Sequence, residues 1–193
     1  MIVRVFLLLL MLAFVSYGAF AQNWFVSPMV GSTFHAKTGF VDLENAVEKK
    51  KVSIGVGGGR FIGSRFGVEG EVAWLPGFFN GDGGLVNSSR VVTTSGNVLV
   101  QFPIGKLRPY GTMGAGWMFV RTEDVADVFT SSSVLKALNG GGGVMAPVKN
   151  WTFRADVRYF ASEHADPQPR IPVIEDRSLR FWRVSVGVIF QLR

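Results

Sequence analysis

The feature that most constrains this chain is a set of segments in which apolar and polar residues alternate. The last of them reads "FWRVSVGVIFQLR" (181–193), where Trp182, Val184, Val186, Val188, Phe190 and Leu192 alternate with Arg183, Ser185, Gly187 and Gln191. A period of two predicts a β-strand with one apolar face and one polar face. The same period gives eight candidate strands, at 24–34, 51–62, 66–75, 91–103, 109–120, 137–147, 151–160 and 179–192.

The connections between these strands alternate in length. After the first, third, fifth and seventh strands come about 15 residues each, rich in Gly, Asp, Ser, Asn and Pro. The other three links are brief, at 63–65, 104–108 and 148–150. Such alternation is typical of membrane barrels with short turns at one end and longer loops at the other. We therefore predict an all-β fold, an eight-stranded antiparallel up-and-down transmembrane β-barrel, with both termini on the side of the short turns.

The N-terminus predicts export. Arg4 precedes an apolar run over 5–15, and small and polar residues follow as far as Ala19-Phe20-Ala21. A basic start, a short apolar run and an A-x-A site are typical of a secretory signal peptide. The run is shorter than the roughly 20 residues that a transmembrane helix needs. We expect a signal peptide at 1–21 and one barrel domain at 22–193.

Composition excludes several kinds of function. The chain has no Cys, which excludes disulfides and thiolate metal sites. The net charge of +6 arises from mixed signs, with no basic run longer than 49–51, which argues against a nucleic-acid partner. The glycine-rich stretches 55–63 and 140–143 lack the spacing and the Lys of phosphate-binding loops. We expect no cofactor.

Periodicity alone leaves open whether the apolar face points inward, as in a soluble lipocalin-like barrel, or outward to lipid. The polar face is often small, as at Ser53, Gly57 and Ser185, which suits a narrow interior. Aromatic residues also gather near strand ends. Near the short turns are Trp24, Phe61, Phe66, Phe102, Tyr110, Trp151 and Phe190, and near the long loops are Phe34, Trp74, Trp117, Phe119, Tyr159, Phe160, Phe181 and Trp182. Two such belts predict aromatic girdles at two membrane interfaces, and hence an apolar face in lipid.

Two stretches carry a resemblance to a known family. "GGGGVMAPVKNWTFRADVRYF" (140–160) and "RPYGTMGAGW" (108–117) are similar to strands of the outer-membrane β-barrel domain family, which includes the transmembrane domain of outer-membrane protein A and opacity-type surface proteins. Met145 stands where the family often has an acidic residue. Many members end on Phe, whereas here Gln191, Leu192 and Arg193 follow Phe190. The resemblance implies a bacterial outer-membrane protein with external loops and periplasmic termini. It also implies contact with the barrel insertion machinery during assembly.

Alternation places charged side chains inside the predicted barrel. We expect a lumen ion-pair network formed by Glu69, Glu71, Arg154, Asp156, Arg158 and Arg183. Opposite charges in a narrow interior have to pair, because an uncompensated buried ion costs several kcal/mol. Arg154 is the expected anchor, with Glu69 or Glu71 as its partner, so that Arg154→Ala should destabilise the barrel well beyond Arg177→Ala. A narrow pore is the alternative interpretation, and a catalytic carboxylate pair at Glu69 and Glu71 has little support.

Other reactive groups are sparse. The histidines are His35, expected at the outer rim, and His164, expected in the fourth long loop. With Ser32, Ser88, Ser89 and Asp82 they supply the residue types of a lipid A acyltransferase or deacylase, but no motif fixes their geometry. Two histidines also make a poor metal site. We expect no catalytic residues and no metal.

The function expected from the sequence is a structural or surface-interaction role through four long extracellular loops. A narrow channel and a lipid A-modifying enzyme remain as alternatives. Outer-membrane lipids are expected partners, with lipopolysaccharide as a candidate. Its phosphates could meet basic residues expected at the outer rim, although these could equally be ordinary solvated side chains; they are Lys49, Lys50, Lys51, Arg90, Arg121, Arg177 and Arg180. The sequence names no extracellular ligand.

Overall fold

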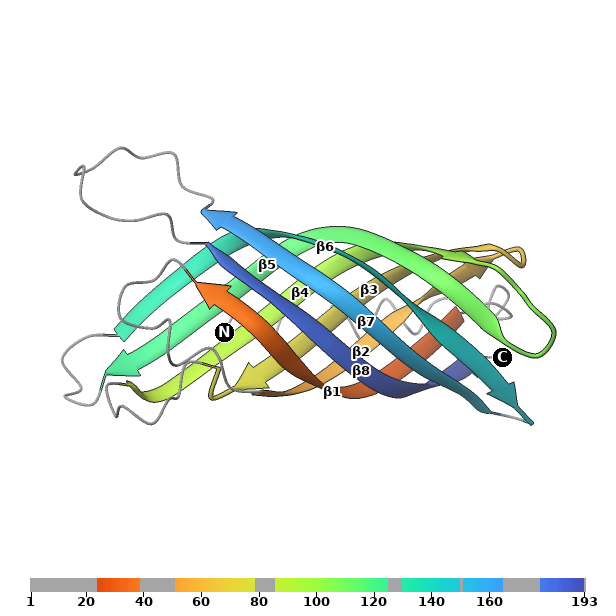
Figure 1. Cartoon of the computed structure of the whole chain (residues 1–193), viewed down its shortest axis with the longest axis horizontal. Helices are drawn as coiled ribbons and strands as arrows, with labels where there is room; N and C mark the ends of the chain where they lie inside the picture. Colours follow the sequence, from red (N-terminus) through yellow and green to blue (C-terminus); the bar gives the residue numbers. More distant parts are fainter. Residues whose placement is uncertain are drawn as a thin grey trace.

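The chain forms one closed antiparallel barrel whose strands follow sequence order, β1 to β8 (Figure 1). The computed structural model describes residues 24–38, 51–78, 86–124, 130–149, 151–164 and 178–192. The strands are β1 (Trp24–Thr38), β2 (Lys51–Ile62), β3 (Phe66–Pro76), β4 (Val86–Gln101), β5 (Arg108–Asp124), β6 (Thr130–Val148), β7 (Trp151–His164) and β8 (Leu179–Leu192). The predicted eight-stranded barrel is confirmed. The predicted signal peptide lies outside the described residues.

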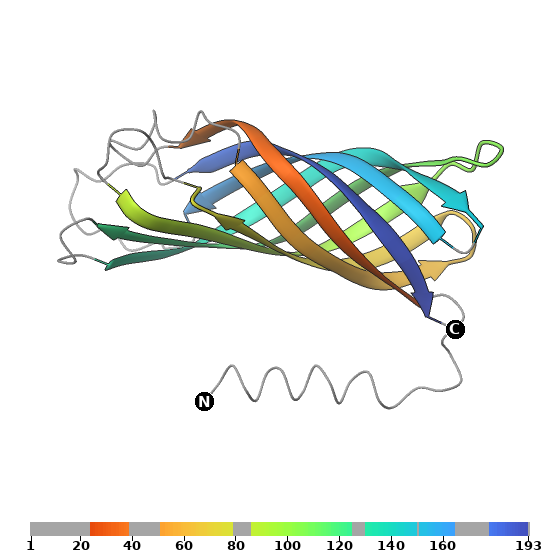
Figure 2. The ribbon, with the colours of Figure 1, turned by 90° about the horizontal axis from the view of Figure 1, so that it is seen from below.

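Pairing of β1 with β8 closes the barrel. Trp24 is the register partner of Leu192, so the first strand begins and the last strand ends at the same end of the sheet. Figure 2 shows these two strands side by side along the barrel wall. The short links after β2, β4 and β6 lie at that end, as the sequence predicts. Among the described residues, no helix is long and apolar enough to cross a membrane.

The strand ends differ from the sequence prediction mainly on the side of the longer connections. β5 continues to Asp124 and β6 begins at Thr130, so their connection is 125–129 instead of the predicted long loop. β7 continues to His164, which was expected within a loop. Thr122 and Ser131 are still register partners in this extension. Backbone pairing therefore continues through a polar stretch in which apolar and polar residues do not alternate.

Apolar side chains cover the outside of the barrel. In β3, Val72 and Trp74 are exposed, whereas Glu71 and Ala73 between them are buried. β8 shows the same alternation, with Trp182 and Val184 outside and Arg183 and Ser185 inside. The apolar face therefore points outward, as a lipid-embedded barrel requires. The polar face of each strand lines the lumen.

Glycine lets the narrow wall pack closely at defined positions. A Cβ on Gly116 would lie 1.8 Å from the carbonyl oxygen of Thr94 on the neighbouring strand, a distance that no side chain tolerates. The turn after β2 uses Gly63 at φ 65°, in the left-handed region that glycine adopts readily. Gly116 is therefore required by the close approach of the neighbouring strand, whereas Gly63 is favoured by the conformation of its turn.

Candidate functional site

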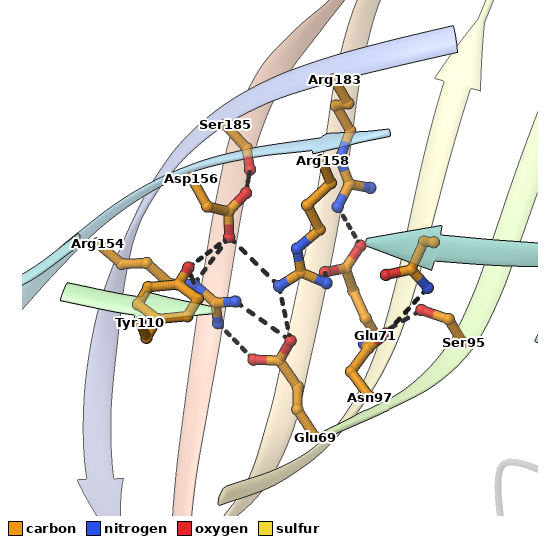
Figure 3. A network of polar contacts seen from close by, with 11 residues as sticks. Glu69, Glu71, Ser95, Asn97, Tyr110, Arg154, Asp156, Arg158, Arg183 and Ser185 are labelled. Carbon is orange, nitrogen blue, oxygen red and sulfur yellow. Dashed lines mark hydrogen bonds and ion pairs between the residues drawn. The ribbon is translucent and has the colours of Figure 1, made fainter. Parts of the chain in front are cut away.

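The candidate site is a charged layer in the middle of the lumen. β3 contributes Glu69 and Glu71, and β7 contributes Arg154, Asp156 and Arg158, all buried. β8 adds Arg183, also buried. Because every second residue of a strand shares a face, each strand places its charged residues on the lumen side at successive levels. The structure thus brings together all six residues that the sequence predicts as an ion-pair network (Figure 3).

Arg154 is paired with Glu69 across the barrel. Its Nη1 is paired with Glu69 Oε2, and its Nη2 donates to Glu69 Oε1 at 3.2 Å, which is a two-pronged arrangement. Its Nε donates to Asp156 Oδ2 at 3.0 Å. β3 and β7 are not neighbours in the sheet, so these contacts span the bore. Paired guanidinium and carboxylate groups of this kind form strong, directional hydrogen bonds.

Arg158 lies between the remaining carboxylates and is completely buried. Its Nη2 donates to Glu69 Oε1 at 3.0 Å and to Asp156 Oδ2 at 3.3 Å. Its Nη1 lies 3.0 Å from Glu71 Oε2, an ion pair that does not meet hydrogen-bond geometry. Arg183 Nη2 donates to Glu71 Oε1 at 2.5 Å. Three carboxylates and three guanidinium groups therefore balance in charge within one connected network.

Tyr110 of β5 belongs to this network and not to a membrane girdle. Its hydroxyl donates to Asp156 Oδ2 at 2.7 Å and accepts from Arg154 Nε at 2.8 Å. The Arg154 guanidinium carbon also lies 5.2 Å from the centre of the Tyr110 ring. Ser185 donates to the other oxygen of Asp156 at 2.6 Å. The prediction of Tyr110 as a girdle residue is wrong, because its side chain is buried in the lumen.

The opposite side of the lumen carries neutral polar groups that the sequence analysis missed. Asn139 of β6 donates to Asn97 Oδ1 of β4 at 3.0 Å, across the intervening strand. Asn97 in turn donates to Ser95 at 3.2 Å. The sequence signal for Asn97 is only its alternation: it lies two residues from the buried Leu99 on β4 and therefore shares its inward face. The contact between Asn97 and Asn139 depends on the curvature of the barrel, which the alternation does not encode.

Apolar side chains fill the lumen on both sides of the charged layer. Toward the longer connections lies an outer apolar layer formed by Ala36, Ala73, Leu75, Phe78, Val91, Met118, Val120, Leu135, Ala137, Phe160, Leu179 and Phe181. Toward the short turns lies an inner apolar layer formed by Phe25, Leu99, Tyr110, Met145 and Ile189, with Phe61 against it. Phe181 stacks on Phe160, with ring centres 5.1 Å apart. The lumen therefore has three layers, apolar, charged and apolar.

The outer surface carries the other predicted girdle residues. Near the short turns, Trp24, Phe66, Trp151 and Phe190 are exposed, and near the longer connections so are Trp74, Trp117 and Trp182. Tyr159 is partly exposed and packs against Trp182, with ring centres 5.1 Å apart. Phe160 and Phe181 were also expected in a girdle, but both lie in the outer apolar layer. Phe61 likewise packs on Phe25 inside.

Other predicted sites receive no assembled geometry from the described residues. His35 is exposed with φ 48°, and its ring meets the edge of Phe34. Within the described ranges, no group of His, Asp and Glu side chains could hold a metal ion. Lys49, Lys50, Asp82 and Arg177 lie outside these ranges, as do the side chains of Ser88 and His164.

Comparisons with known proteins agree with this geometry. A model of the outer membrane protein beta-barrel domain matches residues 6–190. The crystal structure of neisserial surface protein A matches with a TM-score of 0.65 and 13% identity, over 89% of this chain and 97% of that one. The crystal structure of Ail, the attachment invasion locus protein of Yersinia pestis, matches with a TM-score of 0.51 and 15% identity, over 88% and 99%. The solid-state NMR structure of outer membrane protein AlkL matches with a TM-score of 0.52 and 13% identity, over 91% and 93%. No curated protein sequence matches significantly.

Proposed function

Because this chain belongs to the outer membrane protein β-barrel domain family, and is therefore a protein of the bacterial outer membrane, we propose that it acts there as a closed structural barrel that presents its longer loops at the cell surface. In this proposal the termini and short turns face the periplasm. The connections after β1, β3, β5 and β7 face the exterior, where the longer ones, after β1, β3 and β7, meet a ligand or host partner.

The layered lumen is the observation that carries the proposal of a closed barrel. Glu69, Arg154 and Arg158 in the charged layer are each at most 3% exposed. An ion would have to pass both apolar layers and separate charges that neutralise one another. Apolar constrictions exclude water, and a buried ion pair resists loss of either partner. A plugged lumen therefore accounts for these residues better than a conducting pore does.

A non-enzymatic role is also part of the proposal. The lumen carboxylates Glu69 and Glu71 are buried and both are ion-paired with arginines, so neither is open to a substrate. His35 is exposed, and its ring contacts the apolar ring of Phe34. A catalytic histidine base would need an acid to orient it and a nucleophile or water within hydrogen-bond reach. The proposed partners are outer-membrane lipids and, during assembly, the barrel insertion machinery, with no nucleic acid.

Single-channel recording in planar bilayers tests the closed lumen. The purified, folded barrel should give no steady conductance, while a known porin inserted under the same conditions serves as a positive control. A heat-dependent shift on an SDS gel would establish that the inserted protein is folded. Steady conductance by the heat-modifiable form would reject the closed lumen and favour the narrow channel. Mass spectrometry of lipid A with and without the protein should find the acyl chains unchanged, and a change would favour an enzyme.

A loop-shortened variant tests the surface role. Replacement of residues 39–50 by Asn-Gly would shorten this connection. Thr33 is the register partner of Lys51, so residues 34–38 and the two new residues would then join the paired parts of β1 and β2. In a deletion strain, the intact gene should restore both adhesion and membrane integrity. The shortened variant should restore integrity alone. If it restores adhesion as fully as the intact gene, the first loop has no surface role.

A further inference from the structure

The outer wall of the barrel contains a hollow over β5, β6 and β7 that the closed lumen does not explain. Its volume is about 510 Å³, and its lining includes Ala115, Trp117, Lys136, Leu138 and Ala161. The small side chains of Ala115 and Ala161 form an apolar floor, and the larger Trp117 and Leu138 flank it. Lys136 is exposed and is the charged residue of the lining. We name this feature the β5–β7 hollow.

The β5–β7 hollow lies at the level of the aromatic girdle near the longer connections. Trp117, a residue of that girdle, is the register partner of Lys136. Two residues further along β5 is the exposed Phe119, and beyond it the exposed Arg121. Aromatic belts mark the boundary between hydrocarbon and headgroups. The ammonium group of Lys136 therefore stands beside the headgroup region, while the rest of the hollow faces acyl chains.

A track without side chains leads from the hollow toward the middle of the membrane. Ala115 is the register partner of Gly96, which pairs with Gly70, which pairs with Gly58. A Cβ added to Gly96 would meet no atom within 4 Å, so close packing within the protein does not require glycine there. The outer surface along this row is smooth and able to lie against an extended hydrocarbon chain.

Exposed basic side chains lie at the headgroup end of the hollow. Ala161 of β7 is the register partner of Arg180 on β8, and Arg180 is the register partner of Lys37 on β1. Both basic residues are exposed. Like charges placed opposite each other on neighbouring strands are destabilising unless an anion lies between them. The register partner of Lys136 on β7 is Glu163. The exposed basic residues Lys136, Arg180 and Lys37 therefore favour an anionic headgroup at this level.

A second hollow on the outer wall provides the contrast. It measures about 670 Å³ and is lined by apolar residues such as Val30, Ile54, Phe153 and Val186. The one charged residue in its lining, Arg154, points into the lumen and is paired there with Glu69. This second hollow offers hydrocarbon contact alone, whereas the β5–β7 hollow combines hydrocarbon contact with a cationic edge.

We propose that the β5–β7 hollow is a binding site for lipopolysaccharide, with a lipid A phosphate on Lys136 and an acyl chain along Ala115 and Gly96. The ligand needs both a phosphate group and an acyl chain, because the phosphate fits the cationic edge and the saturated chain fits the apolar floor. The proposal rests on the orientation given under the proposed function, since lipopolysaccharide occupies the outer leaflet. It extends that function by giving the barrel a defined lipid partner.

Native mass spectrometry of the full barrel released from detergent micelles tests the site. Bisphosphorylated lipid A is the probe, and its dephosphorylated form, phosphatidylglycerol and inorganic phosphate are the comparison arms. The wild type should retain lipid A in preference to all three. Lys136→Ala should weaken retention roughly tenfold, as expected for the loss of one charge-assisted contact. Ala161→Phe and Gly96→Leu should weaken it by filling the hollow and the track.

Matched controls separate the site from general lipid contact. Ala155→Phe lies on the same outward face of β7 but lines the second hollow, and Lys106→Ala removes an exposed lysine at the opposite end of the barrel. Both should retain lipid A like the wild type. If Ala161→Phe does not fold, as judged by its heat shift on a gel, Gly96→Leu still decides the matter, because its Cβ has open space.

Three outcomes would overturn the proposal: equal retention by Lys136→Ala and Lys106→Ala, equal retention by Gly96→Leu and the wild type, or competition by inorganic phosphate alone. A conductance measurement on the same preparation keeps the two proposals apart. A closed barrel that fails to retain lipid A would reject only the lipid site. A conducting barrel that retains lipid A would reject only the closed lumen.

Discussion

The middle of the lumen and its two ends fill the same bore in different ways. The charged layer fills it with directional contacts, in which Arg158 touches Glu69, Glu71 and Asp156 at once. The apolar layers fill it with hydrocarbon, as where Phe181 stacks on Phe160. Hydrocarbon packing depends on volume and tolerates exchange, whereas a buried ion depends on the presence and direction of its partner. The charged layer should therefore be the least tolerant part of the barrel.

The largest expected effect is that of Arg154→Ala. Removal of one member of a buried ion pair costs about 3–5 kcal/mol, because Glu69 and Asp156 lose a partner while still buried. Urea unfolding in detergent micelles measures the loss. Arg177 lies outside the described residues, so the matched control is Arg65→Ala, in the exposed turn after β2, which should stay within about 0.5 kcal/mol of the wild type. Equal destabilisation by the two changes would show that Arg154 is not an anchor of the charged layer.

A compensating double change sharpens the same comparison. Arg154→Met together with Glu69→Leu removes one positive and one negative charge, so the remaining network stays neutral. Replacement of a buried pair by apolar residues of similar volume is often neutral or stabilising. The double variant should recover most of the stability that Arg154→Ala loses, measured by the same unfolding assay. If it is as unstable as the single variant, the missing partner is not what destabilises Arg154→Ala.

Tyr110→Phe tests the placement of this residue in the charged layer. The change removes the hydroxyl between Asp156 and Arg154 and leaves the ring, so it should cost about 1–3 kcal/mol, the penalty for unsatisfied buried polar groups. Tyr159→Phe is the matched control on the outer face, and it should have little effect on unfolding in detergent. A silent Tyr110→Phe would contradict a role for the hydroxyl in the network.

The smallest effect is expected in the outer apolar layer. Met118→Leu keeps nearly the same volume at a fully buried position, so it should cost less than about 1.5 kcal/mol. Arg154→Lys keeps the positive charge in the charged layer, but a lysine cannot reproduce the two-pronged contact of a guanidinium group. The midpoint of urea unfolding should therefore fall further for Arg154→Lys than for Met118→Leu. The reverse order would mean that volume governs the whole lumen.

The alternation of residues along each strand predicts which side chains face the lumen. The wrong girdle predictions are those that do not follow this alternation. Trp117 and Tyr110 differ by an odd number of positions on one strand, so they have to face opposite sides of the sheet. The prediction of Tyr110 in a girdle rests on its nearness to a strand end alone. The adjacent residues Phe181 and Trp182 were both assigned to a girdle for the same reason, although neighbours on a strand cannot share a face. Strict alternation would have placed Tyr110 and Phe181 inside.

Two features were beyond the reach of the alternation. The pairing of Asn97 with Asn139 joins strands that are not neighbours, so it follows from the curvature of the closed wall. The extension of β5 and β6 past the membrane-facing segment depends on backbone hydrogen bonds between polar residues such as Thr122 and Ser131. No apolar face marks such a stretch, and its composition favours a loop.

The closing ladder between β1 and β8 also constrains how the barrel forms. Trp24 meets Leu192, so the first strand has to find a partner from the far end of the chain. Loop-closure entropy opposes contacts of such long range, and folds dominated by them form slowly. Until β8 pairs with it, β1 has an edge of unpaired backbone donors and acceptors. Such an edge promotes aggregation in water, and its unsatisfied groups cost several kcal/mol each in lipid. Insertion and closure should therefore be concerted, so that neither β1 nor β8 enters lipid with an unpaired edge.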